Sequence, residues 1–403
     1  MTELLAPAGN LEKLVYAERF GADAVYFGLQ QFSLRSFAGN FTLADAEAGL
    51  THLHEHDKRG YCTLNIYPYQ EEYPALLDAA AKLDEMGVDG IIVSDIGVMA
   101  ALRRRGIRAP LHVSTQANTL SPQTIEVLAE LGAARINLAR ELSLERIERL
   151  LPAIAHLDVE TEVFVHGSVC FSYSGRCAIS DYLTGRRANR GACTHPCRWQ
   201  YHLVEEKRPG QYMPVFEDER GTYLFNSRDL ALYRYVPALS QLGIHAFKLE
   251  GRMKSIHYIA QVVSLYRRIL DGESPSEPTI LKWLGRVKNR GYTDGFMKGA
   301  VEPDDYKFEK STPASDAIFL GNIESADATG SILNIRNKVH AGEPVEVLKT
   351  DGTVMTLELP EPLVDVTGET HDAASHGTLI RLPQPLPPYA ILRRPMAFET
   401  SCN

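Results

Sequence analysis

The chain has 403 residues, of which 44% are hydrophobic and 23% are charged, and its net charge at pH 7 is −9. It contains no apolar run near the ~20 residues needed to cross a membrane. Its negative charge excludes a protein coated with phosphate-binding residues, so any contact with nucleic acid must be a local basic surface. Six cysteines, with no export segment in front of Leu4, lead us to expect a cytoplasmic protein with thiols or metal ligands.

Short apolar runs alternate with amphipathic segments from residue 4 to residue 270. The runs predict eight strands, at residues 4–6, 24–28, 62–66, 90–94, 111–114, 135–139, 160–166 and 245–250. Helical periodicity is found between and after them, for example at 11–20, 73–86, 122–131, 144–151 and 255–270. Eight successive strand–helix units predict an α/β fold, a TIM-type (β/α)8 barrel. An open doubly wound sheet is the alternative, although no glycine-rich dinucleotide fingerprint follows the first strand.

The connection between the seventh and eighth strands, residues 167–244, is much longer than the others. A connection of this length is usually functional. It leaves from the carboxyl end of a strand, which is the face where barrel enzymes carry their chemistry. We therefore expect an insertion over the barrel mouth within a barrel domain of residues 1–300.

The C-terminal part of the chain has a different pattern. Residues 301–315 are acidic, contain proline and lack a clear period, which indicates a linker. Residues 316–403 then contain short alternating runs punctuated by glycine and asparagine, at 318–321, 330–335, 344–348, 354–357 and 378–382. These runs predict a small all-β, barrel-like domain.

Four of the six cysteines lie inside the insertion, at Cys170, Cys177, Cys193 and Cys197. Thiolates are soft ligands, and four of them suit either an iron–sulfur cluster or zinc. Unrelated buried cysteines and the disulfides of an exported protein are alternatives. A nucleophile–base pair of Cys170 with His166 would need a third orienting residue, and the ligand interpretation fits better. Cys62, in a predicted strand, and Cys402, at the tail, are not assigned as ligands.

Polar side chains are predicted to converge at the barrel mouth. Strand alternation places Glu162, Phe164 and His166 on one face of the seventh strand, and Lys248, Glu250 and Arg252 on one face of the eighth. Further polar residues occur at or just past strand ends, namely Asn65, Asp95, Gln116 and Arg140. A mouth with both acids and bases suits a small anionic substrate beside a general acid or base. The alternative is a structural polar layer in which these groups neutralise one another, such as Glu250 with Arg252 or Glu162 with His166.

A short basic strip lies among the cysteines. Arg186, Arg187 and Arg190, followed by Arg198, have no acidic residue between them. Such a strip can meet the phosphates of RNA, and it can equally be a solvated loop.

Several long motifs carry a resemblance to a known family. EVFVHGSVCFSYSGRCAIS, at 162–180, resembles the signature of the U32 peptidase-like (collagenase-like) family. Supporting stretches are LLAPAGNLEKL at 4–14, STQAN at 114–118, LARELSLERI at 138–147 and KLEGRMKS at 248–255. RPGQYMPVFEDERGTYLFNSRDL, at 208–230, is similar to the branch that hydroxylates the wobble uridine of certain tRNAs.

The resemblance implies a TIM-type barrel with a [4Fe–4S] cluster on the four insertion cysteines, and conversion of wobble uridine to 5-hydroxyuridine in a reaction that depends on prephenate. Zinc is the alternative metal. We then expect prephenate, or a related small carboxylate, among Arg140, Lys248 and Arg252, with Gln116 and Asn65 also contacting substrate. Catalytic roles are expected for His166, Glu250 and Lys248, and tRNA contacts for Arg186, Arg187 and Arg190.

Other functions remain open at this point. The family's peptidase label suggests proteolysis, although no nucleophile, base and orienting residue can be named together. Sibling branches hydroxylate a ribosomal RNA cytidine or act in ubiquinone hydroxylation, but the latter pair usually lacks a C-terminal β domain. A pure binding or scaffold role is the third class.

Overall fold

A computed structural model describes residues 2–34, 39–170, 172–173, 177–198, 203–204, 212–213, 216–218, 221–223, 227–301, 305 and 314–396. The chain divides into two compact units. The first comprises Met1–Glu18, Ala22–Lys254 and Arg290–Thr312, and the second comprises Arg19–Gly21, Ser255–Asn289 and Pro313–Asn403. Each unit is described by itself below.

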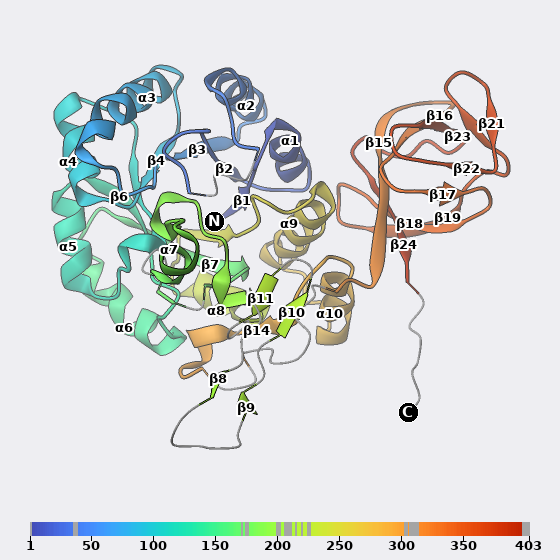
Figure 1. The fold of residues 1–403 in the computed structure, drawn as a ribbon. Coiled ribbons are helices and arrows are strands. Elements are labelled where there is room, and N and C mark those ends of the chain that lie inside the picture. The colour runs from blue at the N-terminus through green and yellow to red at the C-terminus, as the bar shows by residue number, and fades with distance from the viewer. Residues whose placement is uncertain are drawn as a thin grey trace. The chain divides into compact units, whose positions relative to one another are not determined.

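The first unit contains a closed parallel barrel (Figure 1). Its strands are β1 (Glu3–Pro7), β2 (Ala24–Gly28), β3 (Arg59–Thr63), β4 (Gly90–Val93), β5 (Leu111–Val113), β6 (Ala133–Asn137), β7 (Glu160–Gly167) and β13 (Ala246–Leu249). Each pairs in parallel with the next, and β13 pairs with both β7 and β1. That last pairing closes the ring, so the TIM-type barrel is confirmed and the open sheet is excluded.

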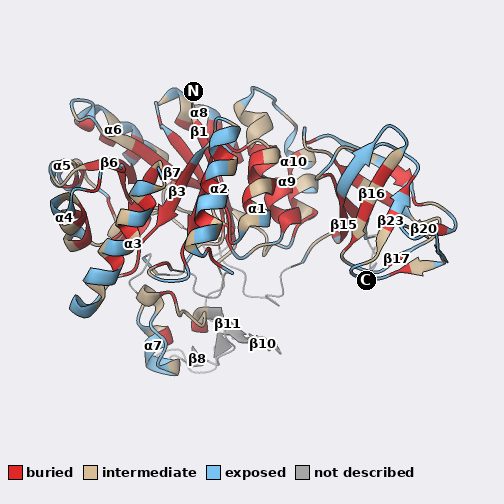
Figure 2. Cartoon of the chain, turned by 90° about the horizontal axis from the view of Figure 1, so that it is seen from above, coloured by how far each residue is buried: buried red, intermediate tan, exposed pale blue. Residues whose placement is uncertain are grey.

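Amphipathic helices surround the strands, with buried residues on one face and exposed residues on the other (Figure 2). They are α1 (Leu11–Arg19), α2 (Leu43–Glu55), α3 (Tyr73–Glu85), α4 (Ile96–Arg105), α5 (Pro122–Glu130) and α6 (Leu144–Ile154). Side-chain caps fix the N-termini of several of these helices. Thr42 and Asp45 form a capping box at the start of α2, and Ser143 caps the start of α6. Two short 3₁₀ helices, η1 (Gln70–Glu72) and η2 (Thr115–Ala117), precede α3 and α5 respectively.

The third strand begins earlier than predicted. The sequence pattern placed it at 62–66, with a loop before it, whereas β3 runs from Arg59 to Thr63. The reason lies in packing: a Cβ on Gly60 would stand only 2.5 Å from the side chain of Leu50 on α2. This glycine is therefore a position of close helix–strand approach within the strand and not part of a turn.

The insertion after β7 contains more structure than the sequence indicated. It holds α7 (Ile179–Thr184), η3 (Ala188–Arg190), η4 (Pro196–Arg198) and four short strands, β8 (Leu203–Val204), β9 (Tyr212–Met213), β10 (Phe216–Asp218) and β11 (Gly221–Tyr223). A fifth strand, β12 (Asp229–Ala231), pairs antiparallel with the end of β7 and parallel with β14 (Tyr292–Thr293). The chain then returns through η5 (Tyr233–Tyr235) and α8 (Val236–Gln241) to β13.

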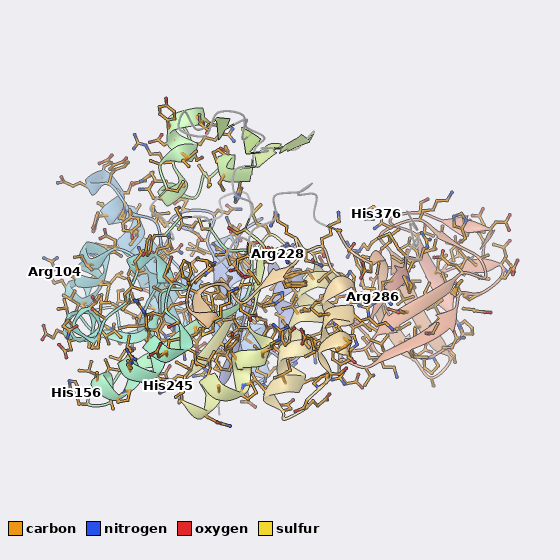
Figure 3. All side chains as sticks on the ribbon, turned by 90° about the horizontal axis from the view of Figure 1, so that it is seen from below. Arg104, His156, Arg228, His245, Arg286 and His376 are labelled. Atoms are coloured by element: carbon orange, nitrogen blue, oxygen red, sulfur yellow. The ribbon has the colours of Figure 1, made fainter. Side chains whose placement is uncertain are left out.

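The insertion lies at the carboxyl end of the barrel strands, as expected from the chain order. Figure 1 looks along the strand ring with α7 drawn across it, and Figure 2, turned by 90°, shows α7 at one end of the strands. Figure 3 shows His156 and His245 at the opposite end, where His245 precedes β13. After β14 the first unit continues into η6 (Gly295–Lys298). Of the predicted linker 301–315, residues 302–304 and 306–313 lie outside the described residues.

The second unit combines two helices, α9 (Ile256–Leu270) and α10 (Glu277–Gly285), with antiparallel β-structure. The main sheet has the order β19-β18-β24-β15-β16-β23-β20-β21. Its strands are β15 (Ala317–Asp327), β16 (Gly330–Ile335), β18 (Pro344–Leu348), β19 (Val354–Glu358), β20 (Leu363–Asp365), β21 (Thr370–His371), β23 (Leu379–Leu382) and β24 (Ile391–Pro395). A further pair joins β17 (Val339–His340) to β22 (Ala373–Ala374).

All five runs predicted for this β domain are strands, and the short strands between them were missed. The core is aliphatic and includes Leu320, Leu333 and Val347, each fully buried. No helix in the described part of the chain is long and apolar enough to span a membrane.

Candidate functional site

A cavity of about 170 Å³ lies at the carboxyl end of the barrel. It lies under residues 170–197, which carry the four insertion cysteines and are called the cysteine segment below. All four insertion cysteines line it. It is also lined by six of the predicted mouth residues, Asn65, Gln116, Arg140, Lys248, Glu250 and Arg252. Residues more than 100 positions apart in the chain thus line the same cavity, because the carboxyl ends of parallel strands meet at the same face of the barrel.

The cysteines of the insertion differ from the cysteine of the barrel. Cys170 is exposed and Cys177, Cys193 and Cys197 are half-buried, and no disulfide joins the described cysteines. The backbone N–H of His195 donates to the sulfur of Cys193 at 3.4 Å. Cys62 is fully buried in β3, where burial raises the pKa of its thiol to about 12. That thiol stays protonated, which agrees with its exclusion as a ligand, whereas Cys402 lies outside the described residues.

Two of the three arginines predicted to contact RNA fasten the cysteine segment to the barrel. The Arg190 guanidinium donates to both carboxylate oxygens of Glu72, one at 2.9 Å, and to the backbone oxygen of Tyr67 at 3.2 Å. These hydrogen bonds hold the pKa of the Glu72 carboxyl below its usual range. Arg187 pairs with Asp181 at 3.5 Å and donates to the hydroxyl of Tyr69. Arg186 is exposed.

A buried ionic network forms the floor of the cavity. Lys248 is 4% exposed, and its Nζ donates to Oε1 of Glu162 at 2.8 Å. The same oxygen accepts from Nδ2 of Asn137 at 2.6 Å, and Arg135 lies 3.7 Å from the other oxygen. Burial lowers the pKa of Lys248, while the carboxylate of Glu162 opposes that shift. The ammonium also lies 4.5 Å from the ring centroid of Tyr26, a cation–π contact.

Arg252 and Arg140 supply positive charge on two sides of the cavity. Arg252 is 4% exposed, and its Nη1 donates to the hydroxyl oxygens of Ser33 at 2.7 Å and Thr63 at 3.2 Å. A Cβ at Gly28 would stand 2.2 Å from that nitrogen, so only glycine lets the guanidinium pass over β2. Arg140 donates to the backbone oxygen of Ser168 at 3.0 Å and lies over the ring of Phe164, 4.0 Å from its centroid.

Asn65 and Gln116 form an amide network on the third side. Nδ2 of Asn65 donates to Oε1 of Gln116 at 2.9 Å. The same oxygen accepts from the hydroxyls of Ser94 at 3.1 Å and Ser114 at 3.0 Å. Oδ1 of Asn65 accepts from the backbone N–H of Leu34 at 3.1 Å. The network ties the ends of four neighbouring chain segments together.

His166, which we expected in the cavity, is not among the residues that line it. Lys248 pairs with Phe164 but Leu249 pairs with His166, so the register shifts by one residue between these pairs. Such a shift reverses the alternation of side chains, and His166 packs against Tyr292 of β14 with ring centroids 5.6 Å apart. Burial lowers the pKa of His166 to about 3, which keeps the imidazole neutral. Glu162 therefore takes Lys248 as its partner and not His166.

Comparison with protein-family models assigns the chain. The model described as peptidase family U32 matches residues 9–307, and the model of the U32 C-terminal domain matches residues 315–393. The chain belongs to peptidase family U32.

Some relatives carry names that refer to RNA, whereas others are named as a protease or a collagenase. "tRNA hydroxylation protein P" of Escherichia coli K12 is 33% identical over all of this chain and 98% of its own length. "tRNA hydroxylation protein P1" of Bacillus subtilis 168 is 34% identical over 93% of this chain and 89% of its own. "23S rRNA 5-hydroxycytidine C2501 synthase" of E. coli K12 is 34% identical over 67% of this chain and 39% of its own.

The U32 barrel also brings to the cavity residues that sequence reasoning missed. Asn137, Phe164, Tyr26, Ser114 and His195 line it. Asn137 was passed over because it fell in the middle of a strand predicted at 135–139, whereas β6 ends at Asn137. The available signal was a polar residue inside an apolar run, which in a barrel strand points either to the interior or to a ligand.

Proposed function

We propose that this U32 protein is an RNA-modifying hydroxylase that converts the wobble uridine of tRNA to 5-hydroxyuridine, with an iron–sulfur cluster and a small carboxylate such as prephenate as co-substrate. The observation that carries the proposal is the cavity in which four cysteines face Arg140, Lys248 and Arg252. Support comes from full-length relatives named as tRNA hydroxylation proteins. A barrel mouth that joins soft ligands to cations suits redox chemistry beside a bound anion.

The cysteines would hold the metal group. Four thiolates on one wall suit a [4Fe–4S] cluster, which supplies one-electron transfer when bound. Zinc, with bonds to sulfur of about 2.3 Å, would draw four sulfurs to within about 4 Å of one another. Among the described residues, no three cysteine sulfurs lie within 4.8 Å of one another. A cluster and zinc would use the same four cysteines, and the iron and sulfide analysis described below distinguishes them.

The carboxylate would bind between Arg140 and Arg252. Both guanidinium groups line the cavity, and both contact neutral oxygens, those of Ser168, Ser33 and Thr63. Two cations beside one cavity suit a carboxylate, whereas Lys248 forms an ion pair with Glu162. Lys248 would then orient the cavity floor, and Glu250, which lines the cavity, would act as the general acid or base.

Recognition of tRNA would be weak and sensitive to salt, because the chain is acidic overall. We propose that Arg186 and Arg187, which are both exposed, contact phosphate at the rim, since Arg190 is less exposed and donates to both carboxylate oxygens of Glu72. We also propose that the protein acts in the cytoplasm, together with its tRNA substrate.

A second candidate function is hydroxylation of a ribosomal RNA cytidine, which the similarity to the 23S rRNA 5-hydroxycytidine synthase favours. Proteolysis has less support. Cys170 lines the cavity and His166 does not, so the Cys170–His166 pair that the sequence suggested for a cysteine peptidase does not meet in the cavity. Sustained cleavage of casein by pure protein, lost in Cys170→Ser, would favour the peptidase after all.

The test is mass spectrometry of tRNA nucleosides from cells that lack this gene and any redundant oxygen-dependent hydroxylase. We expect 5-hydroxyuridine to disappear, to return with the intact gene, and to stay absent with Cys170→Ser, Cys193→Ser or Arg252→Gln. Unchanged 5-hydroxyuridine in the deletion would refute the tRNA assignment, and a changed ribosomal cytidine would select the second candidate. Anaerobic purification with iron and acid-labile sulfide analysis tests the cluster, and stoichiometric zinc without sulfide would refute it.

A further inference from the structure

Two polar atoms in the cavity wall have open hydrogen-bonding capacity. Nε2 of Gln116 and Oδ1 of Asn137 have no hydrogen-bond partner among the described residues. The two side chains are 5% and 2% exposed, and both residues line the cavity. Buried polar groups in folded proteins are nearly always paired, so an open donor and an open acceptor in one cavity indicate a ligand that supplies the complement.

The hydrogen bonds around them determine which atom of each amide is open. Oε1 of Gln116 accepts from three donors, those of Asn65, Ser94 and Ser114, so the open atom must be the N–H₂ group. Nδ2 of Asn137 donates to the carboxylate of Glu162 at 2.6 Å, so the open atom there is the carbonyl oxygen. Flipping either amide would place like groups against each other. The wall therefore offers one donor and one acceptor in defined positions.

Strand register brings the two amides together. Val113 of β5 pairs with Ile136 of β6, so the residues that follow, Ser114 and Asn137, end neighbouring strands at the same level. Gln116 lies one turn further along and accepts from the hydroxyl of Ser114. Neighbouring strands are about 4.8 Å apart. Backbones at this separation allow side chains from the two strand ends to reach one planar ring.

We infer that Gln116 and Asn137 bind the Watson–Crick edge of the uracil that is to be modified. Gln116 donates to a ring carbonyl oxygen, and Asn137 accepts from the N3–H between the two carbonyls. The inference rests on the proposed function and names the residues that select the base. The carboxylate group of the co-substrate offers only acceptors at neutral pH, so it cannot satisfy Asn137. It belongs beside the arginines instead.

The pairing selects uracil over near relatives. Methylation of N3 removes the donor that Asn137 requires, and cytosine presents an unprotonated N3 to the same oxygen. In either case a buried acceptor stays unpaired, which corresponds to a loss of affinity of at least about tenfold. Both open atoms are covered by neighbouring wall atoms, so the entering ring must part the side chains around them.

The test uses the full-length protein with its metal group and three anticodon stem–loop RNAs that differ only at the wobble base. Uridine, 3-methyluridine and cytidine share the same phosphates, so differences in fluorescence-anisotropy affinity report the base alone. We expect the uridine RNA to bind at least about tenfold more tightly than the other two. Equal binding of all three overturns the inference and leaves the tRNA substrate standing. If none of them binds, the inference falls together with the proposed substrate.

A variant series supplies the second arm. Asn137→Ala should bind the uridine and 3-methyluridine RNAs with equal, reduced affinity, because the discriminating acceptor is gone. Asn334→Ala is the matched control, since Asn334 also donates to a glutamate, Glu324 at 3.2 Å, but on the C-terminal sheet. It should keep the full preference for uridine. If a folded Asn137→Ala protein still prefers the uridine RNA over the 3-methyluridine RNA, the inference is contradicted. If that variant does not fold, the affinities of the natural chain for the three RNAs decide the inference.

Discussion

Lys248 of β13 and Glu162 of β7 form an ion pair of 2.8 Å at the floor of the cavity, where their side chains are 5% and 2% exposed. Each residue has an additional polar or aromatic contact, Asn137 for Glu162 and Tyr26 for Lys248. A pair this deep is costly to break, because removing one partner leaves the other charge buried.

We therefore expect Lys248→Ala to lower the free energy of unfolding by about 3–5 kcal/mol. Lys58→Ala is the control, because Lys58 and Asp23 pair at 3.9 Å with side chains about 30% exposed, and its effect should stay below about 1 kcal/mol. Urea unfolding followed by circular dichroism measures both. Equal small losses would mean that the Lys248–Glu162 pair contributes no more than a surface pair.

Buried His166 predicts acid sensitivity. Its pKa is lowered to about 3 by burial, so below pH 6.5 the unfolded chain takes up a proton that the folded chain does not. Stability from this group is complete above pH 6.5 and is lost as the pH falls towards 3, at about 1.4 kcal/mol per pH unit. His166→Gln should reduce the slope of unfolding free energy between pH 6 and pH 4 by about that amount. His376→Gln, at an exposed site (Figure 3), should leave the slope unchanged, and an unaltered slope in His166→Gln would contradict the prediction.

The ion pair of Arg190 with Glu72 allows two roles of that arginine to be distinguished, attachment of the cysteine segment to the barrel and contact with an RNA phosphate. If it fastens the cysteine segment, Arg190→Gln and Glu72→Gln should both release the segment and lower the iron retained per chain after gel filtration. The pair is about one-quarter exposed, so each change should cost about 1 kcal/mol and the double variant little more than either. A direct phosphate contact predicts the opposite for Glu72→Gln, which would then raise the affinity for RNA.

Arg186 is an exposed member of the basic strip and a candidate for a phosphate contact. Arg186→Ala should weaken binding of an anticodon stem–loop at all three wobble bases alike. The plot of log affinity against log salt should become shallower by about 0.7–0.9. Arg104→Ala, on the outer face of α4 (Figure 3), is the control for net charge and should leave that slope as it is. An unchanged slope in Arg186→Ala would remove this residue from the RNA contact.

The barrel and the cysteine set could be predicted from the chain because their signals are local. The strands are short apolar runs, several helices begin at their own caps, and the four cysteines lie within a single insertion. One boundary failed where a long-range contact decided it, at Gly60, whose missing side chain lets α2 approach β3. The chemistry of Asn65, Gln116, Arg140, Lys248, Glu250 and Arg252 at strand ends was enough to bring them to one cavity.

The sequence alone determined the alternation of strands and helices that builds the barrel. It also determined that cysteines and cationic side chains occur at the carboxyl ends of the strands. The tertiary structure decided which of the polar side chains face one another. A one-residue register shift beside Leu249 turns His166 away from the cavity, and an ion pair with Glu72 occupies Arg190. Pairing of β5 with β6 brings Asn137 to the level of Ser114, whose hydroxyl donates to Gln116. Register shifts and ion pairs between distant segments arise only when strands meet, so no local pattern could have shown them.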